Sequence, residues 1–160
     1  MNISTMVEGK IVVLMGSQRD SDFASRIESF LQEEGFDVPC EYVVASAHRR
    51  PRKLLDEIEK FEKKEERIVF ITVAGLSDAL SGVAAGSTKY PVIACPPDSE
   101  KYGYAKLFSS TVTPKGVAVA YVPKPENAAL SAVKILGLFS KDLERNVAEY
   151  MLKQAGKVSS

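Results

Sequence analysis

His48, the only histidine in the sequence, lies in a short polar segment whose residue types could carry out chemistry. Ser46 precedes it by two positions, and Arg49 and Arg50 follow it directly. An imidazole can transfer a proton near neutral pH, and a guanidinium offers a forked donor to a phosphate or carboxylate. The alternative is a solvated turn, in which the arginines face water and the histidine caps a carbonyl group.

A glycine and a hydroxyl group stand at a second candidate site, in residues 16–20. Gly16 and Ser17 come where a helix is expected to begin, so backbone N–H groups and the positive helix end can meet an anion. The segment lacks the glycine spacing of a dinucleotide site and the Lys-Ser or Lys-Thr pair of nucleotide hydrolases. An ordinary strand-to-helix turn capped by Asp20 remains an equal alternative.

A third candidate segment contains Gly75, where the missing side chain would let a ligand approach the backbone closely. Ser77 and Asp78 could contact the same ligand or cap the next helix. Cys95 lies beside Pro96 and has no second histidine to activate it. We therefore expect a buried, inert thiol there.

The candidate segments follow apolar runs that predict buried strands, each succeeded by a helical pattern. The predicted strands are residues 11–15, 38–44, 68–74 and 91–95, and the predicted helices begin near residues 20, 51 and 77. This alternation predicts a doubly wound parallel sheet in a three-layer αβα sandwich. Ligands bind beyond the carboxyl ends of such strands. The candidate segments should therefore converge, which favours a functional interpretation of His48.

After two consecutive prolines at positions 96 and 97 the pattern loosens, and we expect a polar loop. A fifth strand at 116–122, a helix at 127–138 and a last amphipathic segment follow. That last segment has no strand partner, so we expect it to pack on a neighbouring subunit. The length of 160 residues predicts a single α/β domain spanning 1–160, with a core at about 10–138 and a helical extension at 139–160.

The composition excludes several classes of function. Lysine and arginine total 21 and aspartate and glutamate total 21, so no positive field attracts nucleic acid. Cys40 and Cys95, with one histidine, supply neither a disulfide framework nor a four-ligand metal site. The sequence contains no secretory signal pattern and no apolar run of the roughly 20 residues that span a membrane. A cytoplasmic protein without a membrane partner is expected.

Four motifs in order resemble the aminoimidazole ribonucleotide carboxylase and mutase family of purine biosynthesis, over residues 11–138. They are Met15-Gly16-Ser17 with Asp20, Ser46-Ala47-His48-Arg49 with Pro51, Ala74-Gly75, and Pro91-Val92-Ile93. The resemblance implies a flavodoxin-like fold and an enzyme of de novo purine biosynthesis. It also implies no metal or other cofactor, and a homo-oligomer, an octamer, whose sites are shared between neighbouring subunits.

The family has two branches. One is a mutase, which moves a carboxyl group from the exocyclic nitrogen of N5-carboxyaminoimidazole ribonucleotide to the ring carbon. The other carboxylates 5-aminoimidazole ribonucleotide directly with carbon dioxide. Mutases typically carry a second histidine in the third segment. This chain instead reads Gly75-Leu76-Ser77-Asp78-Ala79-Leu80 there, similar to the Gly-Arg-Ser-Asn-Ala-Leu pattern of the direct carboxylase.

Leu76 and Asp78 depart from the carboxylase pattern, and His48-Arg49 with Pro51 is closer to the sequence pattern of the mutases. The resemblance therefore implies the direct carboxylase first and the mutase second. A non-catalytic nucleotide-binding α/β domain is a third alternative.

The resemblance also assigns roles to individual residues. It implies that His48 takes the proton from the ring carbon, that Asp20 binds the ribose hydroxyls, and that Ser17 receives the carboxyl group or carbon dioxide. Ser46 and Arg49 are similar to residues that hold the substrate phosphate. Arg19 stands where relatives often have a second serine. The remaining members of the expected substrate-binding set are Ala47, Ala74, Gly75, Ser77 and Asp78.

Overall fold

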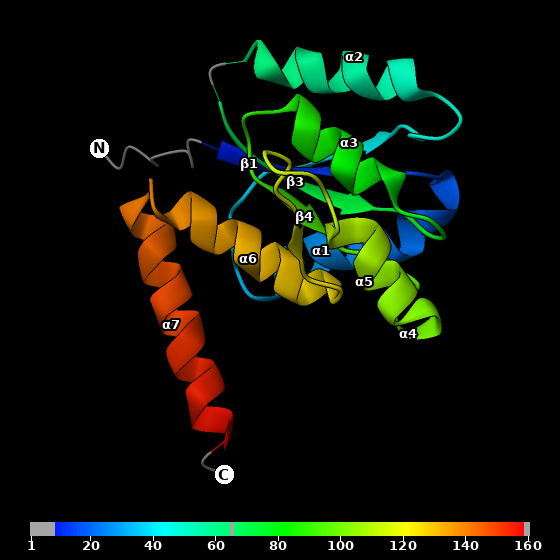
Figure 1. Cartoon of the computed structure of the whole chain (residues 1–160). Helices are drawn as coiled ribbons and strands as arrows, with labels where there is room; N and C mark the ends of the chain where they lie inside the picture. The colour runs from blue at the N-terminus through cyan, green and yellow to red at the C-terminus, as the bar shows by residue number, and fades with distance from the viewer. Residues whose placement is uncertain (1–8, 65, 159–160) are drawn as a thin grey trace.

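A parallel β-sheet forms the centre of the molecule, whose computed structural model describes residues 9–64 and 66–158 (Figure 1). The strands within the described residues are β1 (Gly9–Met15), β2 (Cys40–Val44), β3 (Arg67–Val73), β4 (Val92–Ala94) and β5 (Ala120–Tyr121). They lie in the order β2-β1-β3-β4-β5, and every neighbouring pair is parallel. This is the flavodoxin-like order, so the predicted doubly wound fold is confirmed.

Side chains of β1 alternate between the two faces of the sheet. Ile11, Val13 and Met15 belong to one apolar cluster, and Val12 and Leu14 belong to the other. All of them are buried. A strand covered on both faces needs apolar residues at every position, which explains the continuous apolar run in the sequence.

Helices cover both faces of the sheet (Figure 1). One face carries α1 (Ser21–Glu33) and α6 (Pro125–Gly137), and the other carries α2 (Pro51–Glu62) and α3 (Ala79–Ser87). A short 3₁₀ helix, η1 (Gln18–Asp20), precedes α1. Gly35, with a φ of 73°, follows α1 in the left-handed conformation that glycine favours at helix ends.

The segment after the two prolines differs from the predicted polar loop. It contains α4 (Ser99–Tyr102) and α5 (Tyr104–Thr111), which meet at Gly103. The prediction is wrong because α5 buries Lys106 and Ser110 toward the rest of the molecule, so its sequence lacks an apolar stripe.

The fifth strand is shorter than predicted. Only Ala120–Tyr121 pair with β4, whereas the apolar pattern predicted a strand over residues 116–122. A turn occupies the beginning of that range: the N–H of Val117 donates to the carbonyl of Pro114 at 3.0 Å, and Gly116 has a φ of 96°.

The last helix, α7 (Lys141–Val158), contacts the rest of its own subunit as far along as Lys153. Leu143 is buried in the cluster beneath α1 and α6, and the Tyr150 ring lies 5.7 Å from Phe30 and 5.6 Å from Phe36, centroid to centroid. The Lys153 ammonium lies 3.1 Å from a carboxylate oxygen of Glu34. The carboxyl end of the helix projects away from the body (Figure 1), and Leu152 is exposed. Among the described residues, no helix has both the length and the apolar character to cross a membrane.

Candidate active site

The segments that follow β1, β2 and β3 enclose a pocket of about 360 Å³ at the carboxyl edge of the sheet. The chain turns in opposite directions from β1 and β3 at this point, which is where doubly wound proteins bind ligands. The size suits a small molecule. The lining residues are Gly16, Ser17, Arg19, Asp20, Ser46, Ala47, His48, Arg49, Ala74, Gly75, Leu76, Ser77 and Leu80.

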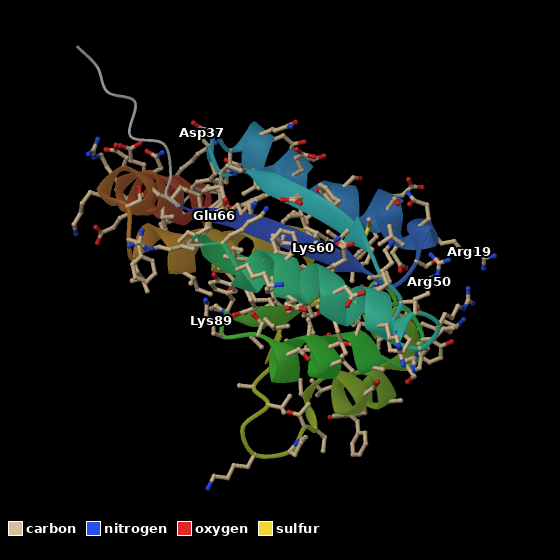
Figure 2. All side chains as sticks on the ribbon, turned by 90° about the horizontal axis from the view of Figure 1, so that it is seen from above. Arg19, Asp37, Arg50, Lys60, Glu66 and Lys89 are labelled. Carbon is tan, nitrogen blue, oxygen red and sulfur yellow. The ribbon has the colours of Figure 1, made fainter. Side chains whose placement is uncertain are left out.

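Ser17 and Asp20 hold the segment after β1 in shape by mutual capping. The Ser17 hydroxyl accepts from the Arg19 N–H at 3.3 Å, and an Asp20 carboxylate oxygen accepts from the Ser17 N–H at 3.0 Å. Asp20 therefore caps the 3₁₀ turn by its side chain, whereas the sequence predicted a cap on the following helix. Figure 2 shows Arg19 at the same end of the molecule as Arg50, far from Asp37.

Burial raises the pKa of the Asp20 carboxyl group above its ordinary value. The nearby carboxylate of Asp98 raises this pKa further, while the N–H bond from Ser17 and the Lys106 ammonium lower it. Asp20 therefore carries its negative charge at some cost, because a second carboxylate, that of Asp98, is close enough to repel it from outside the pocket lining.

The segment after β2 is a tight turn that presents His48. The Ser46 hydroxyl accepts from the Arg49 N–H at 3.2 Å, and the Ser46 carbonyl accepts from the Arg50 N–H at 2.9 Å. Pro51 begins α2, as predicted. Because these contacts are local, the side chains of His48 and Arg49 are left exposed at the pocket.

The third segment presents main chain to the pocket rather than a reactive side chain. A Cβ atom on Gly75 would lie 3.5 Å from an oxygen of Asp98 and 3.8 Å from an oxygen of Asp20, so this backbone runs close to both carboxylates. Leu76 follows with a φ of 62°, in the left-handed region, and its side chain is 70% exposed.

Lys106 and Asp98 support this third segment, and sequence reasoning missed both. The Lys106 side chain is 1% exposed; its Nζ donates to the carbonyls of Ala74, at 2.9 Å, and of Leu76, and lies 2.7 Å from an Asp98 oxygen. The other Asp98 oxygen accepts from the Leu76 N–H at 2.6 Å. A lysine in a polar stretch ordinarily indicates a solvated side chain, so the sequence held no signal for this burial.

Asp78 is the one sequence-predicted site residue that the structure places outside the pocket lining. Its side chain accepts from the N–H and the hydroxyl of Ser81, at 3.0 and 2.6 Å, and from the hydroxyl of Ser110, at 2.7 Å. It is buried between α3 and α5 and caps α3. The capping alternative weighed for Asp78 in the sequence is the one that the structure shows.

Two further features bear on the chemistry of the site. Cys95 is fully buried, and burial raises the pKa of its thiol to about 12, as expected of an inert thiol. Within the part of the chain that the structure describes, no three side chains of the histidine, cysteine, aspartate or glutamate type are grouped to hold a metal ion. The pocket thus offers one imidazole, two arginines, hydroxyl groups, Asp20 and bare main chain.

Residues 10–157 match the AIR carboxylase family. The chain is 43% identical to a phosphoribosylaminoimidazole carboxylase of Archaeoglobus fulgidus, over 88% of this chain and 76% of the relative. It is 41% identical to an N5-carboxyaminoimidazole ribonucleotide mutase of Methanocaldococcus jannaschii, over 92% of each chain. The crystal structure of Treponema denticola PurE superposes with a TM-score of 0.87, at 35% identity and over 94% of each chain.

The fold, the pocket at its switch point and these similarities agree. This chain belongs to the AIR carboxylase family and is an enzyme of purine biosynthesis.

Proposed function

We propose that this protein carboxylates 5-aminoimidazole ribonucleotide with carbon dioxide, giving 4-carboxy-5-aminoimidazole ribonucleotide. The observation that carries the proposal is the placement of His48 in one pocket with Ser17, Asp20, Arg49 and Gly75. The pocket combines a group for proton transfer, a cation for a phosphate, a carboxylate for ribose hydroxyls, and main chain that a planar ring can approach.

The proposed reaction needs little from the protein beyond positioning and one proton transfer. The electron-rich aminoimidazole ring supplies the electron pair for the new bond between its ring carbon and the carbon of carbon dioxide. The hydrogen on that ring carbon then leaves as a proton, which the His48 imidazole accepts, and the ring regains its aromaticity. In the reverse direction His48 returns the proton and carbon dioxide departs.

Two arginines line the end of the pocket at which we place the substrate phosphate. Arg49 can offer a charged, forked donor, and Ser46, whose hydroxyl already fixes the Arg49 N–H, lies beside it. Arg19, in the segment after β1, lines the same pocket. We propose that it supplies by charge a phosphate contact for which relatives often use a serine.

The mutase is the second candidate function, and one observation in this chain favours the carboxylase over it. The mutase pattern includes a second histidine in the third segment, whereas this chain has one histidine in all and places Leu76 and Ser77 at that wall of the pocket. A relative that bears the mutase name is 41% identical, so both reactions need testing.

The test is a comparison of two substrates with the same enzyme preparation. One sample receives 5-aminoimidazole ribonucleotide and bicarbonate, and the other receives freshly made N5-carboxyaminoimidazole ribonucleotide. We expect rapid consumption in the first sample and, in the second, only the rate set by spontaneous decarboxylation. Rapid consumption of the carboxyamino isomer alone would establish the mutase instead, and consumption of neither would leave a nucleotide-binding domain.

We also propose that the protein works as a homo-octamer. Large apolar side chains are exposed in two groups, one on α4 and α5 and one around α7. They are Tyr102, Tyr104, Leu107, Phe108 and Val112, and Leu138, Phe139, Met151 and Leu152. Exposed apolar patches of this kind mark interaction surfaces. Light scattering should give about eight times the 17.5 kDa chain mass, and a monomer at micromolar concentration would contradict the proposal.

A further inference from the structure

The main chain at residues 74–76 is part of the pocket wall, but side chains from outside the wall fix its position. We propose that Lys106 and Asp98 are positioning residues that hold Leu76 in its left-handed conformation and thereby set where the Gly75 backbone meets the nucleotide. This inference rests on the proposed function for the identity of the ligand. Lys106 and Asp98 themselves lie outside the set of residues that line the pocket.

The surroundings of the Lys106 ammonium explain how a buried charge is tolerated. Burying a cation is costly unless it is paired and hydrogen-bonded. Here two carbonyl oxygens, of Ala74 and Leu76, and one carboxylate oxygen of Asp98 surround Nζ. Two of its N–H donors are used by the carbonyls, and the Asp98 oxygen adds an ion-pair contact. Because both carbonyls belong to the third segment, the charge binds that segment directly.

Leu76 is the residue that needs such support. A φ of 62° is uncommon for any residue with a side chain, and it persists only where neighbouring contacts enforce it. The Leu76 side chain is 70% exposed, so packing does not enforce it. Its main chain is held at both ends instead: the N–H donates to Asp98, and the carbonyl accepts from Lys106.

The same contacts determine the shape and charge of the wall. Gly75 adjoins Leu76, and its α-carbon lies where a Cβ would come within 3.8 Å of Asp20. A change in Leu76 would therefore shift the backbone against the carboxylate that we assign to the ribose. The Lys106 charge also opposes the repulsion between Asp20 and Asp98. Loss of Lys106 should accordingly disturb nucleotide binding, although the lysine does not touch the nucleotide.

The first measurement compares Lys106→Met with the wild-type octamer and with Lys10→Met as a matched control. Lys10 is also a largely buried, ion-paired lysine, 14% exposed at its side chain and bound to Glu41 and Glu66, at the amino end of β1. We expect Lys106→Met to raise KM for the nucleotide and to lower kcat/KM by up to about 100-fold, with a smaller change in kcat. Lys10→Met should leave both constants unchanged.

A rescue experiment separates positioning from general destabilisation. Glycine adopts the left-handed conformation without strain, so Leu76→Gly combined with Lys106→Met should recover part of the lost kcat/KM. A purely structural loss around Asp98 would not be recovered by a second substitution that changes only the backbone preference of residue 76. Absence of recovery would overturn the claim that Lys106 acts through Leu76.

Hydrogen exchange tests the inference without any substrate. The Leu76 amide, bound to Asp98 in the wild type, should exchange at least about tenfold faster in Lys106→Met and in Asp98→Ala. If Lys106→Met fails to fold, Asp98→Ala alone and with Leu76→Gly carries both tests. Unchanged Leu76 exchange together with unchanged KM would overturn the inference. An inactive wild type whose Leu76 amide still responds would instead reject the proposed function and retain the positioning role.

Discussion

The segments after β2 and β3 both line the pocket, yet they are built in opposite ways. The His48 turn is held by Ser46, two positions away, and exposes its side chains. The Gly75 segment is held by Asp98 and Lys106, which lie 22 and 30 or more positions away, and it exposes main chain. The His48 turn offers polar and charged side chains to the pocket, and the Gly75 segment offers a shaped surface of main chain.

This difference indicates which substitutions should affect activity and which should affect stability. Under the proposed function, a substitution in the His48 turn removes a group that acts on the substrate, while few structural contacts are lost. A substitution behind the Gly75 segment breaks buried polar contacts first and reaches the substrate only through the backbone. The two kinds of variant should therefore be distinguishable by measuring stability and kinetics together.

The largest effect is expected at His48. Replacing it in His48→Asn should lower kcat by about 100-fold to 10,000-fold, because general base catalysis contributes that much to proton transfer. The thermal unfolding midpoint and the oligomeric state should stay at their wild-type values, since the side chain is exposed. Turnover close to wild type would remove His48 from the reaction and abolish the contrast between the two segments.

The next effect is expected on stability, behind the third segment. Asp78→Ala removes the α3 cap and leaves the hydroxyls of Ser81 and Ser110 without their acceptor, which should lower the free energy of unfolding by about 2 to 4 kcal/mol. Denaturant titration measures it. The control is Asp56→Ala on the exposed face of α2, with an expected change within about 0.5 kcal/mol. Equal effects of the two variants would contradict the buried role of Asp78.

A smaller effect is expected from the phosphate contact. Arg49→Ala should weaken nucleotide affinity roughly tenfold or somewhat more, because a charged hydrogen bond is lost, with unchanged thermal stability. Arg50→Ala is the matched control: Arg50 is the next residue and is also exposed, but it lies outside the pocket lining. Calorimetric titration of both variants with the nucleotide measures the two affinities. An affinity loss at Arg50 equal to that at Arg49 would indicate a diffuse charge effect instead of a contact.

The smallest effect concerns the charge of Asp20. Its pKa is raised in the folded protein, chiefly by burial and also by Asp98, so the folded state binds the proton more tightly than the unfolded state does. Stability from this group therefore falls as the pH rises above the ordinary value of 3.8. Asp20→Asn should unfold at a slightly higher temperature than wild type at neutral pH, and this advantage should vanish below that value.

The exposed Asp22, on the first turn of α1, provides the control for this prediction. Asp22→Asn removes a charge of the same sign two positions away without relieving any burial. Thermal melts from acidic to neutral pH should show a pH-dependent advantage for Asp20→Asn and none for Asp22→Asn. A lower melting temperature for Asp20→Asn at neutral pH would indicate that its contact with Ser17 outweighs the cost of burial.

Much of the fold was predictable because buried parallel strands and amphipathic helices leave local patterns. The apolar run at Ile11–Met15 and the glycine after α1 are examples, and the reactive side chains at strand ends followed from the order of these elements. Lys106 was not predictable, because its burial depends on carbonyls of a segment about 30 residues earlier in the chain. The left-handed Leu76 was hidden for the same reason.

The central claim is that the His48 imidazole takes the proton from the ring carbon of the nucleotide. A crystal structure of the protein with bound 5-aminoimidazole ribonucleotide tests it most directly. The account predicts an imidazole nitrogen facing the ring carbon that receives the carboxyl group, at about 3 Å or through one water molecule, with the phosphate at Arg49. A nucleotide bound with that ring carbon turned away from His48 would contradict it.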